Sequence, residues 1–252
     1  MSTPVLEVRH LCKTFPGRHT ALSAVEDVSF SIAPGQCLGL VGESGSGKST
    51  VARMVCRLLE PTSGQILLHG QDITGLTGRD LRAVYRQLQM VFQSPAESFD
   101  PRRTLGDGIG ESLRVRGVPR RERERRTAAL MERCGLDPAL GARRPHEVSG
   151  GQCQRAAVAR ALAAEPILLI CDEATSALDM TVQRQIMDLL AELKEQDGIA
   201  ILFICHDLAL VQSFCDRTAV LHRGRIAEEG PTEQVLLHPC SKAAKALIDA
   251  AF

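Results

Sequence analysis

A glycine-rich loop between an apolar strand and a helix is the feature that most constrains this chain. Residues 42 to 50 read GESGSGKST and match the pattern G-x-x-x-x-G-K-[ST]. They follow the apolar run Cys37–Val41, typical of a buried parallel strand, and they lead into the helical stretch Ser49–Leu59. This order of strand, loop and helix predicts a phosphate-binding loop within an α/β fold.

Each position of this loop is a candidate nucleotide contact. Glycines let successive backbone N–H groups turn toward phosphate oxygens, and the helix adds the positive end of its dipole. Lys48 is expected to reach the β- and γ-phosphates, and the Ser49 hydroxyl to ligate Mg²⁺. A glycine-rich turn without a ligand is the alternative, which the flanking strand and helix disfavour. The predicted contacts are Gly42, Glu43, Ser44, Gly45, Ser46, Gly47, Lys48, Ser49 and Thr50.

Two adjacent carboxylates end a second apolar strand. Asp172 and Glu173 follow the run Ile167–Cys171, which places both at the carboxyl end of a parallel strand, where α/β folds bind ligands. Successive strand residues point to opposite faces of a sheet, so the two acids can take different roles. We expect Asp172 to hold Mg²⁺, directly or through water, and Glu173 to orient and deprotonate the attacking water.

His206 and Gln93 follow two further expected strands. His206 comes after Ile199–Cys205, and Gln93 comes after Gln89–Phe92. Because parallel strands end at one edge of a sheet, both residues belong beside the phosphate loop. A lone histidine is more often only a hydrogen-bonded polar residue, but the neighbouring motifs favour a functional one here. The Gln93 amide is placed to contact Mg²⁺ or water.

A second anion-binding helix start lies far along the chain from the phosphate loop. Ser149, Gly150, Gly151 and Gln152 open a helix with an N-cap serine and two glycines. A single nucleotide bound to its own loop does not account for this turn.

Length and composition describe an ordinary globular chain. The 252 residues are 44% hydrophobic and 24% charged, and 30 Lys and Arg balance 30 Asp and Glu. This excludes disordered and collagen-like chains and disfavours a duplex nucleic-acid binder, which normally has a basic excess. The longest apolar run, Ile199–Cys205, is too short to cross a bilayer. The start has no secretory signal pattern and the nine cysteines include no Cys-x-x-Cys pair, so we expect an intracellular protein with free, mostly buried thiols.

Strands and helices alternate along most of the chain, which predicts a parallel sheet with an antiparallel fringe. The first ninety residues read as short strands and turns around the first helix. From Thr104 to Leu140 the pattern becomes helical and rich in arginine, which indicates a separate lobe. Its run Arg120–Arg126 alternates with glutamate, so we interpret it as a solvated helix face rather than a nucleic-acid patch. The expected strands are 5–8, 25–32, 37–41, 65–69, 89–92, 167–171, 199–205 and 218–221, and the expected helices after 49–59 are 181–196 and 208–214.

Together these segments resemble the nucleotide-binding subunit of an ATP-binding-cassette (ABC) transporter. The likeness runs from Val5 to about Ala250, with the family's motifs in the family's order. It implies a single ABC ATPase domain over residues 1–252, of the P-loop NTPase (RecA-like) type. An antiparallel β subdomain and the core would occupy about 1–92 and 165–252, and an inserted α-helical subdomain with the signature motif about 100–164. The motifs are Gly42 to Thr50, Gln93, Ser149 to Arg155, Leu168 to Asp179, and His206.

The resemblance also implies a head-to-tail dimer that encloses two ATP molecules. The turn from Ser149 to Gln152 of one cassette would close on the γ-phosphate held by Lys48 of the other. The family's remaining roles would fall on Phe15 as the ring that stacks on adenine, Asp179 in the loop that couples the two sites, His206 as γ-phosphate sensor, and Gln93 as the link to the membrane partner.

Finer matches are similar to the importer branch for oligopeptides, dipeptides and nickel or metal chelates. They are Gln89–Pro95, Phe99–Arg102, Arg144–Ser149 and Gly230–Glu233. The branch implies two transmembrane permease subunits, indirect work with an extracytoplasmic solute-binding protein, and a place on the cytoplasmic face of the inner membrane. The second cassette is usually a related sister subunit, with self-pairing left open. Peptide importers of this branch usually extend past the position of Phe252, which tilts the expectation toward nickel or metallophores.

Two other functions fit less well. A soluble cassette ATPase acting on nucleic acid or the ribosome usually carries two cassettes or zinc-binding cysteines, and a small-molecule kinase does not need a Ser-Gly-Gly-Gln helix. The chain also departs from the family at Cys153, where arginine is common, at Cys205, where threonine or serine is usual, and at Cys240, where an aromatic residue is frequent. None of these departures removes a catalytic group.

Overall fold

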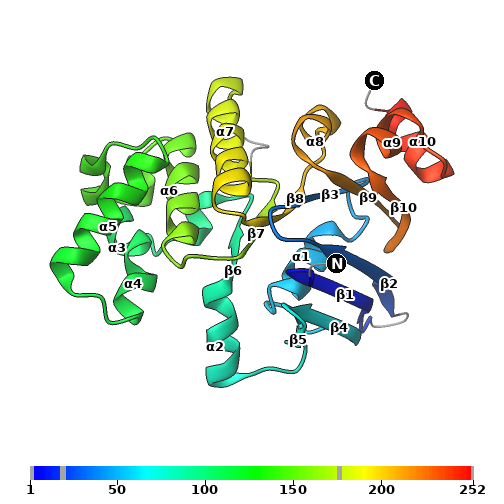
Figure 1. Cartoon of the computed structure of the whole chain (residues 1–252), viewed down its shortest axis with the longest axis horizontal. Coiled ribbons are helices and arrows are strands. Elements are labelled where there is room, and N and C mark those ends of the chain that lie inside the picture. The colour runs from blue at the N-terminus through cyan, green and yellow to red at the C-terminus, as the bar shows by residue number, and fades with distance from the viewer. Residues whose placement is uncertain (1–2, 18–20, 175–177, 251–252) are drawn as a thin grey trace.

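Two β-sheets and a helical lobe make up the part of the chain that this computed structural model describes, residues 3–17, 21–174 and 178–250 (Figure 1). The strands are β1 (Leu6–Phe15), β2 (Leu22–Ile32), β3 (Cys37–Val41), β4 (Ser63–Leu68), β5 (Gln71–Asp72), β6 (Leu88–Val91), β7 (Leu168–Asp172), β8 (Ala200–Ile204), β9 (Arg217–His222) and β10 (Arg225–Pro231). The helices are α1 (Lys48–Val55), α2 (Gly78–Gln87), α3 (Leu105–Ile109), α4 (Glu111–Val115), α5 (Arg120–Arg133), α6 (Gly150–Leu162), α7 (Met180–Gln196), α8 (Leu208–Phe214), α9 (Thr232–Leu237) and α10 (Lys242–Asp249). No helix within those ranges is long and apolar enough to cross a membrane.

The central sheet has six strands in the order β10-β9-β3-β8-β7-β6, and the five from β9 to β6 run parallel. Every residue of β3, β7 and β8 is buried, as expected for parallel strands that are covered on both faces. The polar edge strand β10 joins β9 in antiparallel fashion.

The second sheet is antiparallel, with strand order β2-β1-β4-β5. It lies below the central sheet in Figure 1, with α1 between the two. Alternate residues of β3 divide between the two hydrophobic cores: Leu38 and Leu40 pack with α1 and the antiparallel sheet, whereas Cys37 and Val41 pack on the side of α6, α7 and α8. Because alternate residues of the strand point to opposite faces, one face of β3 packs against α1, which holds this helix and the loop before it beneath the central sheet.

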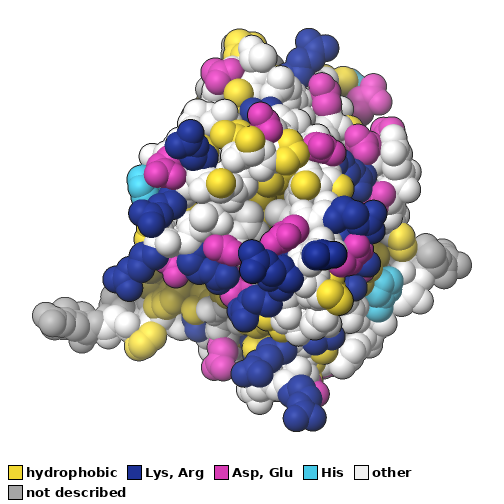
Figure 2. All heavy atoms as spheres, turned by 90° about the vertical axis from the view of Figure 1, so that its left-hand side faces the viewer, with side chains coloured by type: hydrophobic (Ala, Val, Ile, Leu, Met, Phe, Trp, Pro, Cys, Tyr) yellow, Lys and Arg dark blue, Asp and Glu magenta, His cyan; other side chains and the backbone are white. Residues whose placement is uncertain are grey.

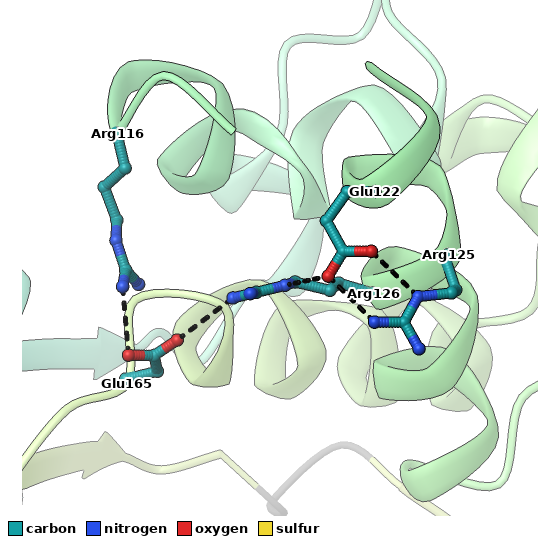
Figure 3. A network of polar contacts seen from close by, with 5 residues as sticks. All are labelled: Arg116, Glu122, Arg125, Arg126 and Glu165. Carbon is teal, nitrogen blue, oxygen red and sulfur yellow. Dashed lines mark hydrogen bonds and ion pairs between the residues drawn. The ribbon is translucent and has the colours of Figure 1, made fainter. Parts of the chain in front are cut away.

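Helices α3 to α6 form a separate lobe, seen at the left of Figure 1. Figure 2 shows arginine and acidic side chains interspersed on its outer surface. Arg125 and Arg126 on α5 both pair with Glu122, at 2.8 and 2.7 Å, and Arg126 and Arg116 meet Glu165 at the end of α6 (Figure 3). The arginine-rich run is a solvated, internally paired helix face, as the sequence indicates.

Several element predictions need correction. The first helix ends at Val55 rather than Leu59, because Arg57 takes a left-handed conformation with φ of 56°. The first ninety residues contain a helix, α2, where the pattern predicted only strands and turns. Strand β10 and helices α9 and α10 have no counterpart among the elements predicted from the sequence.

The other predicted elements are present with ends shifted by a few residues, except that β1 continues to Phe15. The predicted strand 37–41 matches β3 at both ends, and the predicted helix 208–214 matches α8 at both ends. Residues 175–177, inside the predicted motif Leu168 to Asp179, lie outside the described residues.

Candidate active site

Four parallel strands deliver the candidate residues to one edge of the central sheet. Strands β3, β8, β7 and β6 are neighbours in matched register, so the segments that follow them leave the sheet on the same side. The phosphate loop follows β3, Gln93 follows β6, Glu173 follows β7, and His206 follows β8. The structure thereby confirms that the strand ends predicted from separate parts of the sequence converge.

The phosphate loop depends on glycines at its two ends. Gly42 has a φ of 151°, and a Cβ there would lie 2.1 Å from the carbonyl oxygen of Leu221. Gly47 has a φ of 110°, and a Cβ there would lie 2.5 Å from the carbonyl oxygen of Ala24. Any side chain would push the loop off β9 and β2, so these glycines fix its shape. A Cβ at Gly45 meets nothing within 4 Å, so the middle of the loop is open.

Lys48 begins α1 and is only 7% exposed. Its Nζ donates hydrogen bonds to the carbonyl oxygens of Gly42 and Glu43, both at 2.8 Å. Burial lowers the pKa of Lys48, and the nearby charges of Glu173 and Asp172 oppose that shift. The ammonium group is thus held within the loop that would surround a phosphate.

Ser49 and Asp172 form the pair predicted to hold magnesium. The Ser49 hydroxyl donates to Asp172 Oδ1 at 3.1 Å, although the two residues come from α1 and β7. Asp172 is 7% exposed, and burial raises the pKa of its carboxyl group, partly offset by the bond from Ser49. A hydroxyl and a carboxylate oxygen are the hard oxygen donors that Mg²⁺ prefers, so the residues present fit the ion.

Glu173 is held by contacts on two sides. Its backbone N–H donates to the carbonyl oxygen of Ile204 at 3.0 Å, and its Oε2 accepts a hydrogen bond of 2.7 Å from Gln93 Nε2. The backbone has a φ of 49°, an uncommon left-handed conformation for a residue with a side chain. Such strained positions concentrate at functional sites, where the surrounding structure enforces them. Here β8 holds the backbone of Glu173 and Gln93 holds its carboxylate.

His206 is exposed shortly after the end of β8. It lies between Cys205, which is buried, and Asp207, which is half-buried. The carboxylate of Asp207 accepts bonds from the N–H groups of Ala209 at 2.9 Å and Leu210 at 3.3 Å, which caps α8. The cap fixes the turn that presents His206 at the sheet edge.

The turn from Ser149 to Gln152 lies in the helical lobe. Ser149 accepts from the Gln152 backbone N–H at 3.2 Å, and the Gln152 side chain accepts from the Ser149 N–H at 3.0 Å, which completes a capping box. Ser149 and Gly150 are exposed. The structure therefore confirms the predicted N-cap. Within residues 3–17, 21–174 and 178–250, the hydrogen bonds of this turn stay at the start of α6 and do not join it to the phosphate loop of the same chain.

Phe15 and Asp179 make local contacts at the ends of their own elements. Phe15 ends β1 half-buried, opposite Leu22, with Lys13 Nζ 5.2 Å from its ring centroid. Asp179 accepts bonds from the N–H groups of Thr181 at 3.1 Å and Val182 at 3.0 Å, so it caps α7. The structure gives both residues a defined local role, and the roles implied by resemblance remain proposals.

Arg53 is a charged neighbour of the site that the sequence analysis missed. Its positive charge lowers the pKa of Asp172, against the larger effect of burial. The spacing in the sequence could have indicated this neighbour, because Ser49 and Arg53 lie four residues apart on one helix and share a face.

Comparisons with known proteins agree with this geometry. Residues 25–176 match the family model described as ABC transporter. A Brucella ovis protein named as a peptide import ATP-binding protein is 44% identical over 249 residues, which span 98% of this chain and 78% of the relative. The glutathione import ATP-binding protein GsiA of Escherichia coli is 49% identical over 244 residues, which span 94% of this chain and 39% of that protein.

Solved structures give the same result for the fold. A dimeric ATP-binding cassette in a post-hydrolysis state with ADP and Pi aligns with a TM-score of 0.82 at 28% identity, over 90% of this chain and 98% of that one. The cassette cbiO1 of Clostridium perfringens aligns with a TM-score of 0.81 at 27% identity, over 94% of this chain and 92% of that one.

Proposed function

The chain belongs to the ABC transporter family, and on that premise we propose that it is the ATP-hydrolysing subunit of a peptide importer. Family membership makes the chain an ATP-binding ATPase. The observation that carries the proposal is the convergence of Lys48, the Ser49–Asp172 pair and Glu173 at one sheet edge. These residues supply a cation that binds phosphate, oxygen donors that bind a metal ion, and a carboxylate that activates water.

Binding of ATP uses the phosphate loop. Its backbone N–H groups and the start of α1 hold the phosphates, and Lys48 exchanges the carbonyl oxygens of Gly42 and Glu43 for phosphate oxygens. Ser49 and Asp172 would hold Mg²⁺, which neutralises charge on the phosphate oxygens when bound. In this proposal Phe15 stacks on adenine.

Hydrolysis uses Glu173. Its carboxylate orients the attacking water and accepts its proton, and Gln93, already bonded to Oε2 at 2.7 Å, keeps the carboxylate turned to the site. His206, exposed at the end of the neighbouring strand, donates to the γ-phosphate.

A second cassette completes each site in this proposal. The turn from Ser149 to Gln152 is capped, its Ser149 and Gly150 are exposed, and among the described residues none of its hydrogen bonds reaches its own phosphate loop. In this proposal it serves a partner's ATP. The positive end of the α6 dipole, at the start of this helix, favours binding of an anion. Dimeric solved cassettes of the same fold support this arrangement. Asp179, at the start of α7, would lie in the loop that couples the two sites.

The membrane partner has a candidate docking groove of about 640 Å³ between α2 and α4. Arg79, Arg82 and Arg86 line one wall, and Val115 on the other is 66% exposed. A cytoplasmic permease segment with acidic and apolar side chains fits this groove. Attachment through such permeases would place the chain on the cytoplasmic face of the membrane, with the solute-binding protein acting on the far side.

Peptides are the solute class that the relatives support, since their names refer to peptide and glutathione import. Nickel and metallophores have no support in those names. We regard a nucleic-acid or ribosome function as disfavoured.

Tagged chain should be purified from its native membrane in mild detergent and its partners identified. We expect two multi-spanning permeases, a cassette partner, and a solute-binding protein that takes up peptides. Recovery with ribosomes or DNA-repair factors instead would refute the transport proposal.

A further inference from the structure

Gly151, in the first turn of α6, packs directly against Val182, in the first turn of α7. A Cβ at Gly151 would lie 2.7 Å from Val182 Cγ1 and 3.1 Å from Cγ2, closer than real contacts allow. A Cβ at the preceding Gly150 would meet nothing within 4 Å. The two adjacent glycines of the signature turn therefore face different constraints within the same chain: a side chain at Gly151 would force Val182 or the helices to shift, whereas a Cβ at Gly150 would meet no neighbour.

The position of Val182 is itself fixed. Its backbone N–H donates to the Asp179 carboxylate at 3.0 Å, so the N-cap of α7 anchors it. A β-branched side chain in a helix has one strongly preferred rotamer, which makes Val182 a stiff surface. One turn further along, Arg155 of α6 donates to Gln185 of α7 at 3.0 Å, so the two helices also touch beyond the first turn.

We propose that Val182 is a positioning residue that sets the signature turn in place for the partner's ATP. The proposal rests on the dimeric function given above. Through this contact, α7, which starts shortly after Glu173 in the sequence, determines where Gly151 and its neighbours lie. Each chain thus connects the ATP site that it builds with the ATP site that it completes in its partner.

The test is a set of substitutions in the Glu173→Gln background, which is expected to keep ATP bound. Gly151→Ala, Val182→Ala, the double substitution and Val182→Thr are compared for ATP-driven dimerisation by sedimentation and for ATP affinity of the dilute monomer. Gly151→Ala should weaken dimerisation at least about tenfold, because small misplacements of reacting groups are costly, and leave monomer ATP affinity within about twofold. The double substitution should recover to within about threefold of Val182→Ala alone.

Val182→Thr is the matched control, since threonine keeps the shape of valine; it should dimerise like the parent. The proposal is overturned if the double substitution is as impaired as Gly151→Ala, because the glycine would then be required by the partner's nucleotide alone. It is also overturned if monomer ATP affinity falls in parallel with dimerisation. Failure of the parent Glu173→Gln chain to dimerise with ATP, either with itself or with its co-purified sister cassette, would instead refute the proposed function.

Discussion

Replacing Asp172 by asparagine should stabilise the nucleotide-free protein while destroying its activity. The Asp172 carboxylate is 7% exposed and accepts a hydrogen bond from the Ser49 hydroxyl. The positive charges of Arg53 and Lys48 offset part of the cost of burial, but burial outweighs them. Lys48 directs its ammonium group at loop carbonyl oxygens, and Glu173 adds a like charge. A buried charge with so little compensation is costly, and asparagine keeps the oxygen that Ser49 needs.

We expect Asp172→Asn to raise the free energy of unfolding by about 1 kcal/mol, within the usual range for single substitutions. For a chain of this size that corresponds to a rise in Tm of about 2–4 °C. Differential scanning calorimetry without nucleotide measures it. Asp188→Asn is the control, because Asp188 is exposed on α7 and should shift Tm by less than about 1 °C.

The same variant should lose its response to ligand. Magnesium and ATP at a hundredfold excess over Kd would stabilise the parent by about 2.7 kcal/mol, and Asp172→Asn should gain much less. A fall in Tm of the nucleotide-free variant with its secondary structure intact would refute the reasoning, since Asp172 would then contribute to folding rather than only to function.

Three further predictions concern single side chains. Lys48→Ala should weaken ATP binding about tenfold to a hundredfold in isothermal titration, as expected for a charged hydrogen bond worth about 1.5–3 kcal/mol, and unchanged affinity would contradict the phosphate-loop assignment. Phe15→Ala should weaken ATP about threefold to tenfold but leave inorganic triphosphate unaffected, because only adenine offers a ring to stack on; equal losses for both would exclude stacking. Cys240 is exposed, whereas burial raises the pKa of Cys205 to about 11, so at pH 8 a thiol reagent should modify Cys240 first, and rapid labelling of Cys205 would show that the core opens.

The sequence predicted the strands that have uninterrupted apolar runs. Strands β3, β7 and β8 are buried on both faces, so every position must be apolar and the run itself marks the strand. Where a segment is only half-buried, the signal weakens. Helix α2 buries only Val84 and carries three arginines, and β10 is a polar edge strand, so neither was predicted.

The composition of the site was predictable because its residues follow strand ends, and parallel strands share an edge. The contacts within the site were not. Lys48 meets Gly42 locally, but Ser49 reaches Asp172 and Gln93 reaches Glu173 across 123 and 80 positions of sequence. The tight packing of Gly151 on Val182 likewise depends on how two helices meet, which periodicity does not encode.

The central claim is that Glu173 is the base of an ATPase whose sites close between two cassettes. The direct measurement is steady-state ATP hydrolysis by the Glu173→Gln chain, with the oligomeric state recorded in the same samples by light scattering. We predict that turnover falls by about 10² to 10⁴ while ATP stays bound and holds the protein as a dimer. Turnover near that of the parent would contradict the account, and so would a chain that binds ATP yet dimerises neither with itself nor with its sister cassette.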